Sequence, residues 1–400
     1  MSEQDASLVD YYRRNNFNPV PIDLATPEAL SSHTAKRRNL YDGHLGIPMG
    51  LLGRQKVLEF GCNSGENAVV LALCGADLTL VEPNEQVHQR LRDVFSAFGL
   101  EARLAALSSL GIDDFPEDEK FNMVLAEGFL FTLPNKAAMA AKICRLLAPG
   151  GIGVISFNCR FGGLIEMHKR LALYRACELA GVEFRSEASL SIAQEMIGPA
   201  FGRISASRPC PAWWKDLLVN PFYADRYLWS YGELLPVLEA AGAELLSTSP
   251  RWFVEEPMRW YKNVPAAGTR HAAVMDQWRK GFGSMLTGKP AHPNHVADGE
   301  AGTDVVAGVE ALVLGISDYT EGVRGLDCVT LSGPLAAWLA AARDPNLSAL
   351  AGCLQMLHAA LNEQDAARFR ASVAASGLAE LWGSAYHYLS FARGMGTAGA

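Results

Sequence analysis

VLEFGCNSGEN, residues 57–67, joins an apolar run typical of a buried strand to a turn with glycines at 61 and 65. Such a turn leaves backbone N–H groups free at the start of a helix, and glycine lets an electron-rich ligand approach closely. The dinucleotide pattern GxGxxG is not satisfied, because Asn63 occupies the position of its second glycine. The triphosphate-binding pattern is not satisfied either, because no Lys followed by Ser or Thr comes after Gly65.

A carboxylate follows the next expected strand. Glu82 closes the run LTLVEPN, residues 78–84. A carboxylate at this place can accept both hydroxyls of a ribose. A glycine turn, no phosphate pattern and an acidic ribose partner together indicate a nucleoside without phosphates, and S-adenosylmethionine (SAM) fits that description.

The surrounding sequence predicts stacked βα units around a parallel sheet. From about residue 55 to 160, short β-rich runs alternate with helical stretches. We expect a doubly wound α/β fold. The expected strands are residues 56–60, 78–82, 102–107, 121–127 and 153–158, and the expected helices between them are residues 66–75, 84–99 and 135–151.

The rest of the chain divides into further parts, as 400 residues lead one to expect. A long helix follows the fifth strand at 164–181, and 231–253 predicts a helix and a strand that return to the sheet. The expected organisation is an N-terminal lid segment (1–46), a ligand-binding domain (47–262) with an insertion at about 182–230, and a helical C-terminal region (263–400).

Three motifs in this order resemble the class I SAM-dependent methyltransferases, over roughly residues 50–160 with a return at 231–255. They are VLEFGCNSGEN, LTLVEPN and LLAPGGIGVISF, the last at residues 146–157. Each motif alone is degenerate, but the order and the spacing are those of the family. LLAPGG before a strand forms the turn ahead of the fifth strand in this family.

The resemblance implies a role for individual residues. Gly61, Cys62 and Gly65 would pass under the methionine part of SAM. Around the rest of the cofactor we expect Glu59 near its amino group, Glu82 on the ribose and Pro83 on the adenine. At the adenine amine we expect either Ser108, Ser109 and Leu110, through backbone or hydroxyl groups, or Asp113. Glu127 and Gly128 would lie at the edge shared with the acceptor. The segment AEGFLF at 126–131 is not the tetrapeptide of enzymes that methylate amino groups of DNA or RNA bases.

Methyl transfer requires alignment of the acceptor and, for a hydroxyl of high pKa, a base. Glu127 and His168 are the candidate bases, although a histidine on a helix is more often a satisfied structural residue. The N-terminal segment would close over the cofactor or hold an anionic acceptor, or it would present a solvated basic face. Its lid candidates are Tyr11, Tyr12, Arg37, Arg38 and Tyr41.

The insertion is rich in aromatic residues, which could line an acceptor pocket or form a small core. We favour the pocket, because insertions at this position of the methyltransferase fold often cover the acceptor. The residues are Trp213, Trp214, Phe222, Tyr223, Tyr227, Trp229 and Tyr231.

The composition narrows the partners. Thirty-five basic and forty-three acidic residues give a net charge of −8, which disfavours nucleic acid and anionic membranes. The eight cysteines contain no CxxC pair, so no metal is expected. No secretory segment is recognisable, which favours the cytoplasm.

The sequence therefore predicts methyl transfer from SAM, with S-adenosylhomocysteine as product, to an oxygen or nitrogen of a small metabolite, with secondary metabolism as the expected context. The alternatives are a non-catalytic binding or scaffolding module and an NAD-dependent oxidoreductase. The C-terminal helices could form a homodimer or simply buttress the acceptor side.

Overall fold

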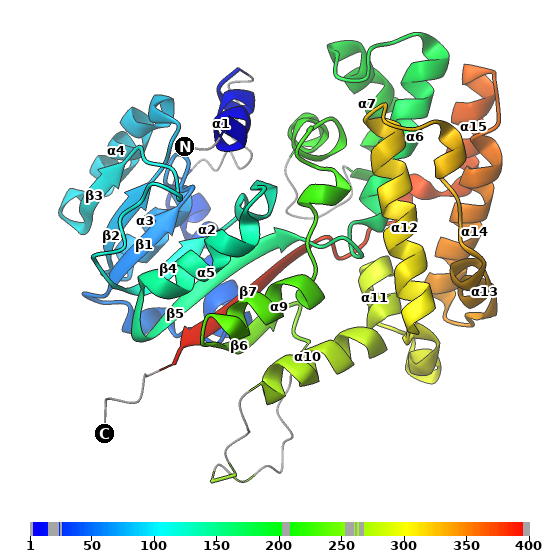
Figure 1. Ribbon diagram of the computed structural model, residues 1–400. Helices are drawn as coiled ribbons and strands as arrows, with labels where there is room; N and C mark the ends of the chain where they lie inside the picture. Colours follow the sequence, from blue (N-terminus) through cyan, green and yellow to red (C-terminus); the bar gives the residue numbers. More distant parts are fainter. Residues whose placement is uncertain are drawn as a thin grey trace. The chain divides into compact units, whose positions relative to one another are not determined.

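The computed structural model describes residues 3–14, 24, 26–201, 209–252, 260, 262–263 and 268–394 (Figure 1). The chain folds into two compact units, and each is built from segments far apart in the sequence. Unit 1 comprises residues 1–157, 231–275 and 387–400, and unit 2 comprises residues 158–230 and 276–386.

Unit 1 is built on a seven-stranded sheet with the order β3-β2-β1-β4-β5-β7-β6. The first five strands pair in parallel, and β6 and β7 are antiparallel to each other. The strands are β1 Lys56–Phe60, β2 Asp77–Val81, β3 Leu104–Ser108, β4 Phe121–Ala126, β5 Leu147–Asn158, β6 Ala243–Ser249 and β7 Tyr386–Arg393. This order confirms the expected doubly wound α/β fold.

The helices of unit 1 form two packed groups. One group contains α2, α3 and α4, and in the other α5 packs against α9. The bounds are α1 Glu3–Arg14, α2 Pro27–Arg38, α3 Glu66–Leu73, α4 His88–Ala97, α5 Lys136–Leu146, α9 Tyr231–Ala240 and α10 Thr269–Lys280, the last of which ends in unit 2. The core between sheet and helices joins Val69 and Leu71 of α3 to Leu78, Leu80 and Met123 of the strands.

The last strand contradicts part of the expected organisation. Residues 386–393 lie in the region expected to be wholly helical, but they form β7 between β5 and β6. Leu389 and Phe391 are fully buried, and Gly153 of β5 leaves room for the Phe391 ring. Strand β7 therefore completes the sheet, and the helices α10 to α15 that precede it span residues 269–376.

Unit 2 is helical and is organised around α6, Leu164–Ala180, which ends at Gly181 as predicted. Helix α6 contacts α7, α11, α12 and α15. The other helices of unit 2 are α7 Glu187–Phe201, α8 Cys210–Trp213, α11 Phe282–Thr287, α12 Thr303–Thr320, α13 Gly333–Ala341, α14 Pro345–Ala360 and α15 Ala366–Ser376. Because α6 is buried on almost all sides, the insertion and the C-terminal helices form one core around it.

Candidate active site

Three carboxylates lie on one face of the sheet at the ends of adjacent strands. Side chains alternate along a strand, and Val57, Leu80 and Leu125 belong to the core that packs on α3. Two residues beyond each of these positions come Glu59, Glu82 and Glu127. Their exposed fractions are small, 3% for Glu59 and 8% for Glu82. This edge of the sheet therefore concentrates negative charge where ligands bind in open α/β folds.

The glycine turn is held against Glu82. The backbone N–H of Asn63 donates to Glu82 Oε2 at 2.9 Å, and that of Asn84 donates to Oε1 at 2.8 Å. Asn63 has a φ of 49° and Gly61 a φ of 67°, so the turn is left-handed where the chain leaves β1. Each carboxylate oxygen keeps a second lone pair for a hydroxyl donor. Glu82 is thus oriented for the ribose role that the sequence predicts.

Gly61 is required by its surroundings as well as by its backbone conformation. A Cβ atom at this position would lie 2.6 Å from the ring of Phe129, which follows β4. The glycine turn and the loop after β4 are therefore in direct contact at Gly61 and Phe129. Gly128, just before Phe129, donates its N–H to Ser156 Oγ at 2.8 Å, which fixes the second loop.

Glu59 is buried and incompletely paired. Its Oε2 atom has no hydrogen-bond partner among the described residues. Burial raises the pKa of Glu59 to about 8, and the nearby Glu127 and Glu82 add to this increase while Arg37 opposes it. A buried acceptor without a partner carries a penalty that a ligand cation would relieve.

Replacing Glu59 by glutamine is expected to stabilise the ligand-free protein increasingly as pH rises from 4.5 to about 8. The folded state holds a proton on Glu59 that the unfolded chain releases in this range, so the parent loses stability with rising pH. Thermal unfolding of the parent and Glu59→Gln across this range measures the difference. A difference independent of pH would show that Glu59 ionises as freely in the folded protein as in the unfolded chain.

Helix α2 contributes a cation to this face. Arg37, with 6% of its surface exposed, donates from both terminal nitrogens to Glu127, each at 2.8 Å. Tyr41 lies in the π-helical segment Asn39–His44 that continues α2, and its hydroxyl donates to Glu127 Oε1 at 2.5 Å. The N-terminal segment thus reaches the carboxyl end of β4 through Arg37 and Tyr41.

This geometry removes Glu127 from the candidate bases. Burial alone would raise its pKa, but the charge of Arg37 and the hydrogen bonds from Arg37 and Tyr41 outweigh burial and lower the pKa below its ordinary value. A carboxylate whose pKa is lowered and whose two oxygens both accept hydrogen bonds is a weak proton acceptor. Glu127 instead anchors α2 to the sheet.

His168 is also a structural residue. Its Nδ1 lies 2.8 Å from the Leu164 carbonyl oxygen and its Nε2 lies 3.3 Å from Nε2 of His358, so both ring nitrogens have partners inside unit 2. Burial, followed by the second histidine, lowers the pKa of His168 to about 3. A nitrogen of such low basicity is unsuited to general-base catalysis at neutral pH.

Arg38, the third lid candidate, points to solvent. It pairs with Asp42 at 3.2 Å, and 60% of its side chain is exposed. Tyr11 and Tyr12 lie half-buried in α1, with ring centroids 5.9 Å apart. Because α2 turns once in 3.6 residues, Arg37 and His33 share its inner face, and Arg38 is on the outer face.

The insertion aromatics are buried within the helical unit. Trp213 packs between Phe201 and Trp382, with ring centroids 5.0 and 5.4 Å away, and Tyr227 packs on Phe222. These contacts are those of a small core. Exposed fractions are 5% or less throughout the set, which comprises Trp213, Trp214, Phe222, Tyr223, Tyr227 and Trp229. Tyr231 begins α9 and belongs to unit 1.

The expected adenine side is made largely of backbone. The Glu82 N–H donates to the Ser108 carbonyl at 2.9 Å, and the Leu110 N–H donates to Ser108 Oγ at 3.2 Å. Leu110 is 42% exposed, so an apolar side chain stands at this edge. Asp113 accepts from Asn135 Nδ2 at 2.8 Å and is engaged in fixing the loop.

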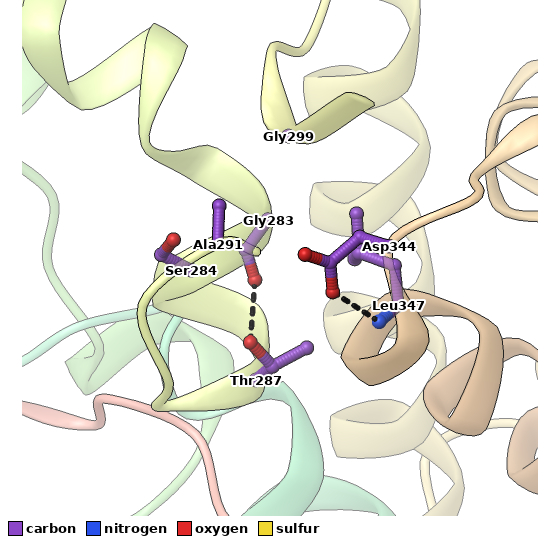
Figure 2. Close-up of a pocket in the computed structure, with 7 residues that line it drawn as sticks. All are labelled: Gly283, Ser284, Thr287, Ala291, Gly299, Asp344 and Leu347. Carbon is purple, nitrogen blue, oxygen red and sulfur yellow. Dashed lines mark hydrogen bonds between the residues drawn. The ribbon is translucent and has the colours of Figure 1, made fainter. Parts of the chain in front are cut away.

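Unit 2 contains a small pocket, and its lining residues are distant in the sequence from the glycine turn and the three carboxylates. It is lined by Gly283, Ser284, Thr287, Ala291, Gly299, Asp344 and Leu347 (Figure 2). Figure 2 shows the Thr287 hydroxyl bonded to the Gly283 carbonyl and Asp344 bonded to the Leu347 N–H. Because its polar groups cap helices, we interpret this pocket as a packing gap.

Within the described ranges, no helix has the length and apolarity needed to cross a bilayer. The same part of the chain contains no group of three or more His, Cys, Asp or Glu side chains arranged to hold a metal ion.

The comparisons with known proteins address this same region. A family model described as a methyltransferase domain, Methyltransf_23, matches residues 32–192. The sequence matches no curated protein. The structure is similar to the 4+2 cyclase SpnF, with 14% identity over 92% of this chain and 82% of that chain and a TM-score of 0.37.

Two methyltransferase structures show similarity at the same level. Magnesium protoporphyrin IX methyltransferase (ChlM) from Synechocystis PCC 6803, with bound SAM, is 14% identical over 40% of this chain and 77% of that chain, with a TM-score of 0.32. PKMT2 from Rickettsia typhi, in complex with AdoHcy, is 15% identical over 60% of this chain and 49% of that chain, with a TM-score of 0.41.

The matched residues include the glycine turn, the three carboxylates and the five parallel strands in the order β3-β2-β1-β4-β5. These features define a methyltransferase domain of the Rossmann-like type. This match supports the resemblance to the class I SAM-dependent methyltransferases that the motifs led us to expect.

Proposed function

We propose that this protein transfers the methyl group of SAM to an oxygen or nitrogen of a small-molecule metabolite. The observation that carries the proposal is the difference in hydrogen bonding between two carboxylates beside the glycine turn. Glu82 is oriented by two backbone N–H groups, whereas Glu59 has a buried oxygen without a partner. A nucleoside that carries an ammonium group supplies hydroxyl donors to Glu82 and a cation to Glu59.

The residues around the turn fit such a cofactor. Gly61 and Gly65, both in left-handed backbone conformation, would lie under its methionine part. Cys62 and Ser109 line the neighbouring backbone, and Pro83 and Leu110 offer apolar contacts to a base. We propose Gly128 at the edge where the acceptor enters, because its loop packs directly on Gly61 through Phe129.

When bound, SAM supplies an electrophilic methyl group on a sulfonium sulfur. The chain then has to orient the acceptor, exclude water and keep the charges at this edge fixed. Arg37 neutralises the charge of Glu127, and Arg37 and Tyr41 together hold its carboxylate in place. The acceptor would therefore meet side chains whose positions are fixed. With neither Glu127 nor His168 free to take a proton, we propose catalysis by alignment, which suits an acceptor that is nucleophilic without a base.

A small-molecule acceptor is supported by the excess of acidic residues, which disfavours polyanions. The acceptor contacts proposed in unit 1 are Tyr11, Tyr12 and Tyr41 of the N-terminal segment. The insertion aromatics, including Trp213 and Trp229, fill a core within unit 2 instead. A role in secondary metabolism and assembly as a homodimer belong to the same proposal.

Glu82→Ala is expected to weaken the binding of S-adenosylhomocysteine by roughly ten- to a hundredfold, because a charged acceptor of two hydroxyls is lost. Calorimetric titration of the purified protein measures this change. The matched control is Glu85→Ala, which removes an exposed carboxylate three positions away and should leave the affinity unchanged.

Transfer itself is tested with SAM carrying a labelled methyl group over panels of small hydroxyl and amine compounds. Label in an organic product that depends on Glu82 supports the proposal. Tight binding of SAM with no transfer to any small molecule, but with transfer to protein or nucleic acid, would overturn the proposed acceptor class. No binding of SAM would overturn the proposed function altogether.

A further inference from the structure

Strands β5 and β7 are neighbours in the sheet, and two contacts fix their register. Just beyond the two strands, the Cys159 N–H donates to the Ala385 carbonyl oxygen at 2.7 Å. Six residues earlier on β5, Gly153 faces the ring of Phe391, which lies six residues later on β7. Because the steps are equal and opposite, the two strands are antiparallel, and the opposed residues between these contacts are defined.

Tyr388 is opposite Ser156 in this register, and Ser156 in turn is level with Glu127. The second step follows from the pairing of β4 with β5, which sets Ala126 beside Ile155, one residue earlier on each strand. Opposed residues of a sheet point to the same side. Tyr388 and Glu127 therefore share one face of the sheet, and their backbones are separated by two strand spacings, about 10 Å.

The neighbouring contacts agree with this placement of Tyr388. Ser390, two positions further along β7, donates its hydroxyl to the Leu45 carbonyl oxygen at 2.7 Å, and Tyr388 packs against the core that contains Leu45. Tyr388 is half-buried, and its phenol interacts electrostatically with Arg37, the residue that holds Glu127. The last strand of the chain thus brings a phenol to the face on which the three carboxylates lie.

The strand order places Tyr388 relative to the proposed cofactor. The proposed ribose carboxylate, Glu82, follows β2, and Gly61, proposed under the methionine part, follows β1. Strands β4, β5 and β7 continue the sheet on the side of β1 away from β2. Tyr388 therefore lies beyond Glu127 on the side that the proposed cofactor leaves to the acceptor.

We propose that the Tyr388 hydroxyl binds the acceptor and aligns it for methyl transfer. The inference rests on the proposed function. The phenol oxygen accepts a hydrogen bond from the O–H or N–H group that is methylated, which directs the lone pair of that group toward the methyl carbon. Glu127 is unsuited to this task, because Arg37 and Tyr41 occupy both of its oxygens.

This role defines the acceptor as a group whose nucleophilic atom carries a proton, namely a hydroxyl or a primary or secondary amine. In the transfer, the lone pair of the acceptor forms the new bond to the methyl carbon, and the bond from that carbon to the sulfonium sulfur breaks with its electrons passing to sulfur. The proton of the acceptor leaves to water. A phenol at this position needs only to orient the acceptor, in agreement with catalysis by alignment.

The test is Tyr388→Phe, which removes the hydroxyl and keeps the ring. Its affinity for S-adenosylhomocysteine, measured by calorimetric titration, should equal that of the parent, which also shows that the variant is folded. With labelled SAM and the panel of hydroxyl and amine compounds, kcat for the compounds that the parent methylates should fall roughly ten- to a hundredfold, because an aligning hydrogen bond is lost.

The matched control is Tyr174→Phe. Tyr174 is also half-buried, but it lies on α6 within unit 2, with its ring centroid 5.1 Å from that of Phe184 and 5.0 Å from that of Tyr319. Its replacement should change neither kcat nor the affinity. An unchanged kcat in Tyr388→Phe, an equal loss in both variants, or a weakened affinity for S-adenosylhomocysteine in Tyr388→Phe would overturn the role of Tyr388 and leave the proposed function intact. A parent that methylates no compound of the panel would overturn the proposed function, and the role of Tyr388 with it.

Discussion

Arg37→Met should lower the stability of unit 1 by about 3–5 kcal/mol, because it leaves the Glu127 carboxylate buried without its counter-charge. Both side chains of this pair are 7% exposed, so water cannot replace the guanidinium. Tyr41 still donates one hydrogen bond to Glu127, but one neutral donor does not compensate a buried charge. Hydrogen exchange of the amides of β4, or chemical denaturation, measures the change.

The neighbouring residue provides the control. Arg38 also pairs with a carboxylate, Asp42, but on the exposed face of α2. Arg38→Met should cost less than about 1 kcal/mol. The double variant Arg37→Met with Glu127→Gln should recover most of the loss, since the isolated charge is gone. If Arg37→Met costs no more than Arg38→Met, α2 is not anchored by this pair.

The contribution of the Arg37–Glu127 ion pair to stability should also decrease at acid pH. The pKa of Glu127 is lower in the folded protein than its ordinary value, because Arg37 and its hydrogen bonds outweigh burial. Its contribution to stability is therefore complete above the pKa of the unfolded chain and is lost as pH falls through the folded value. The difference between parent and Arg37→Met should shrink correspondingly in acid.

Gly153→Val should destabilise unit 1 by about 3 kcal/mol through overpacking. A Cβ at Gly153 would lie 2.2 Å from Cζ of the Phe391 ring, so β5 and β7 could not both keep their places. Thermal unfolding of the purified variant measures the loss. Gly50→Val is the control, because a Cβ at Gly50 meets nothing within 4 Å and its φ is negative.

The ring of Phe391 can itself be removed to test the cause. Phe391→Ala alone should cost about 3–5 kcal/mol, because it empties a buried site. Combined with Gly153→Val, it should cost clearly less than the sum of the two, since the new methyl groups fill part of the space. Simple additivity would show that the two positions are not in contact.

Local pattern was sufficient for the first half of unit 1. The strand 56–60 was predicted to the residue, and α6 ends at Gly181 as expected. These elements have strong alternation or clear glycine stops, which act within a few residues. The expected helix 135–151 was too long, because LAPGG, residues 147–151, is already part of β5.

The candidate site likewise contains residues that local pattern predicts and residues whose state depends on tertiary contacts. Glu82, Gly61 and Gly65 were predicted because their positions follow from the strand–turn–helix pattern itself. The outward direction of Arg38 and the inward direction of His33 depend on how α2 lies on α3, and its helical spacing was the available signal. The paired states of Glu127 and His168 depend on partners 90 and 190 residues away, which no local pattern encodes.

By itself, the sequence determined a parallel α/β domain with a glycine turn after its first strand and a carboxylate at the end of its second, because each depends on residues that are close along the chain. Tertiary structure alone decided that residues 386–393 return to complete the sheet and that the insertion shares a core with the C-terminal helices. It also decided which polar groups remain unpaired. Glu59 and His33 have unpaired atoms because burial removed their water while the folded chain supplied no partner, and such a balance exists only once distant segments have packed together.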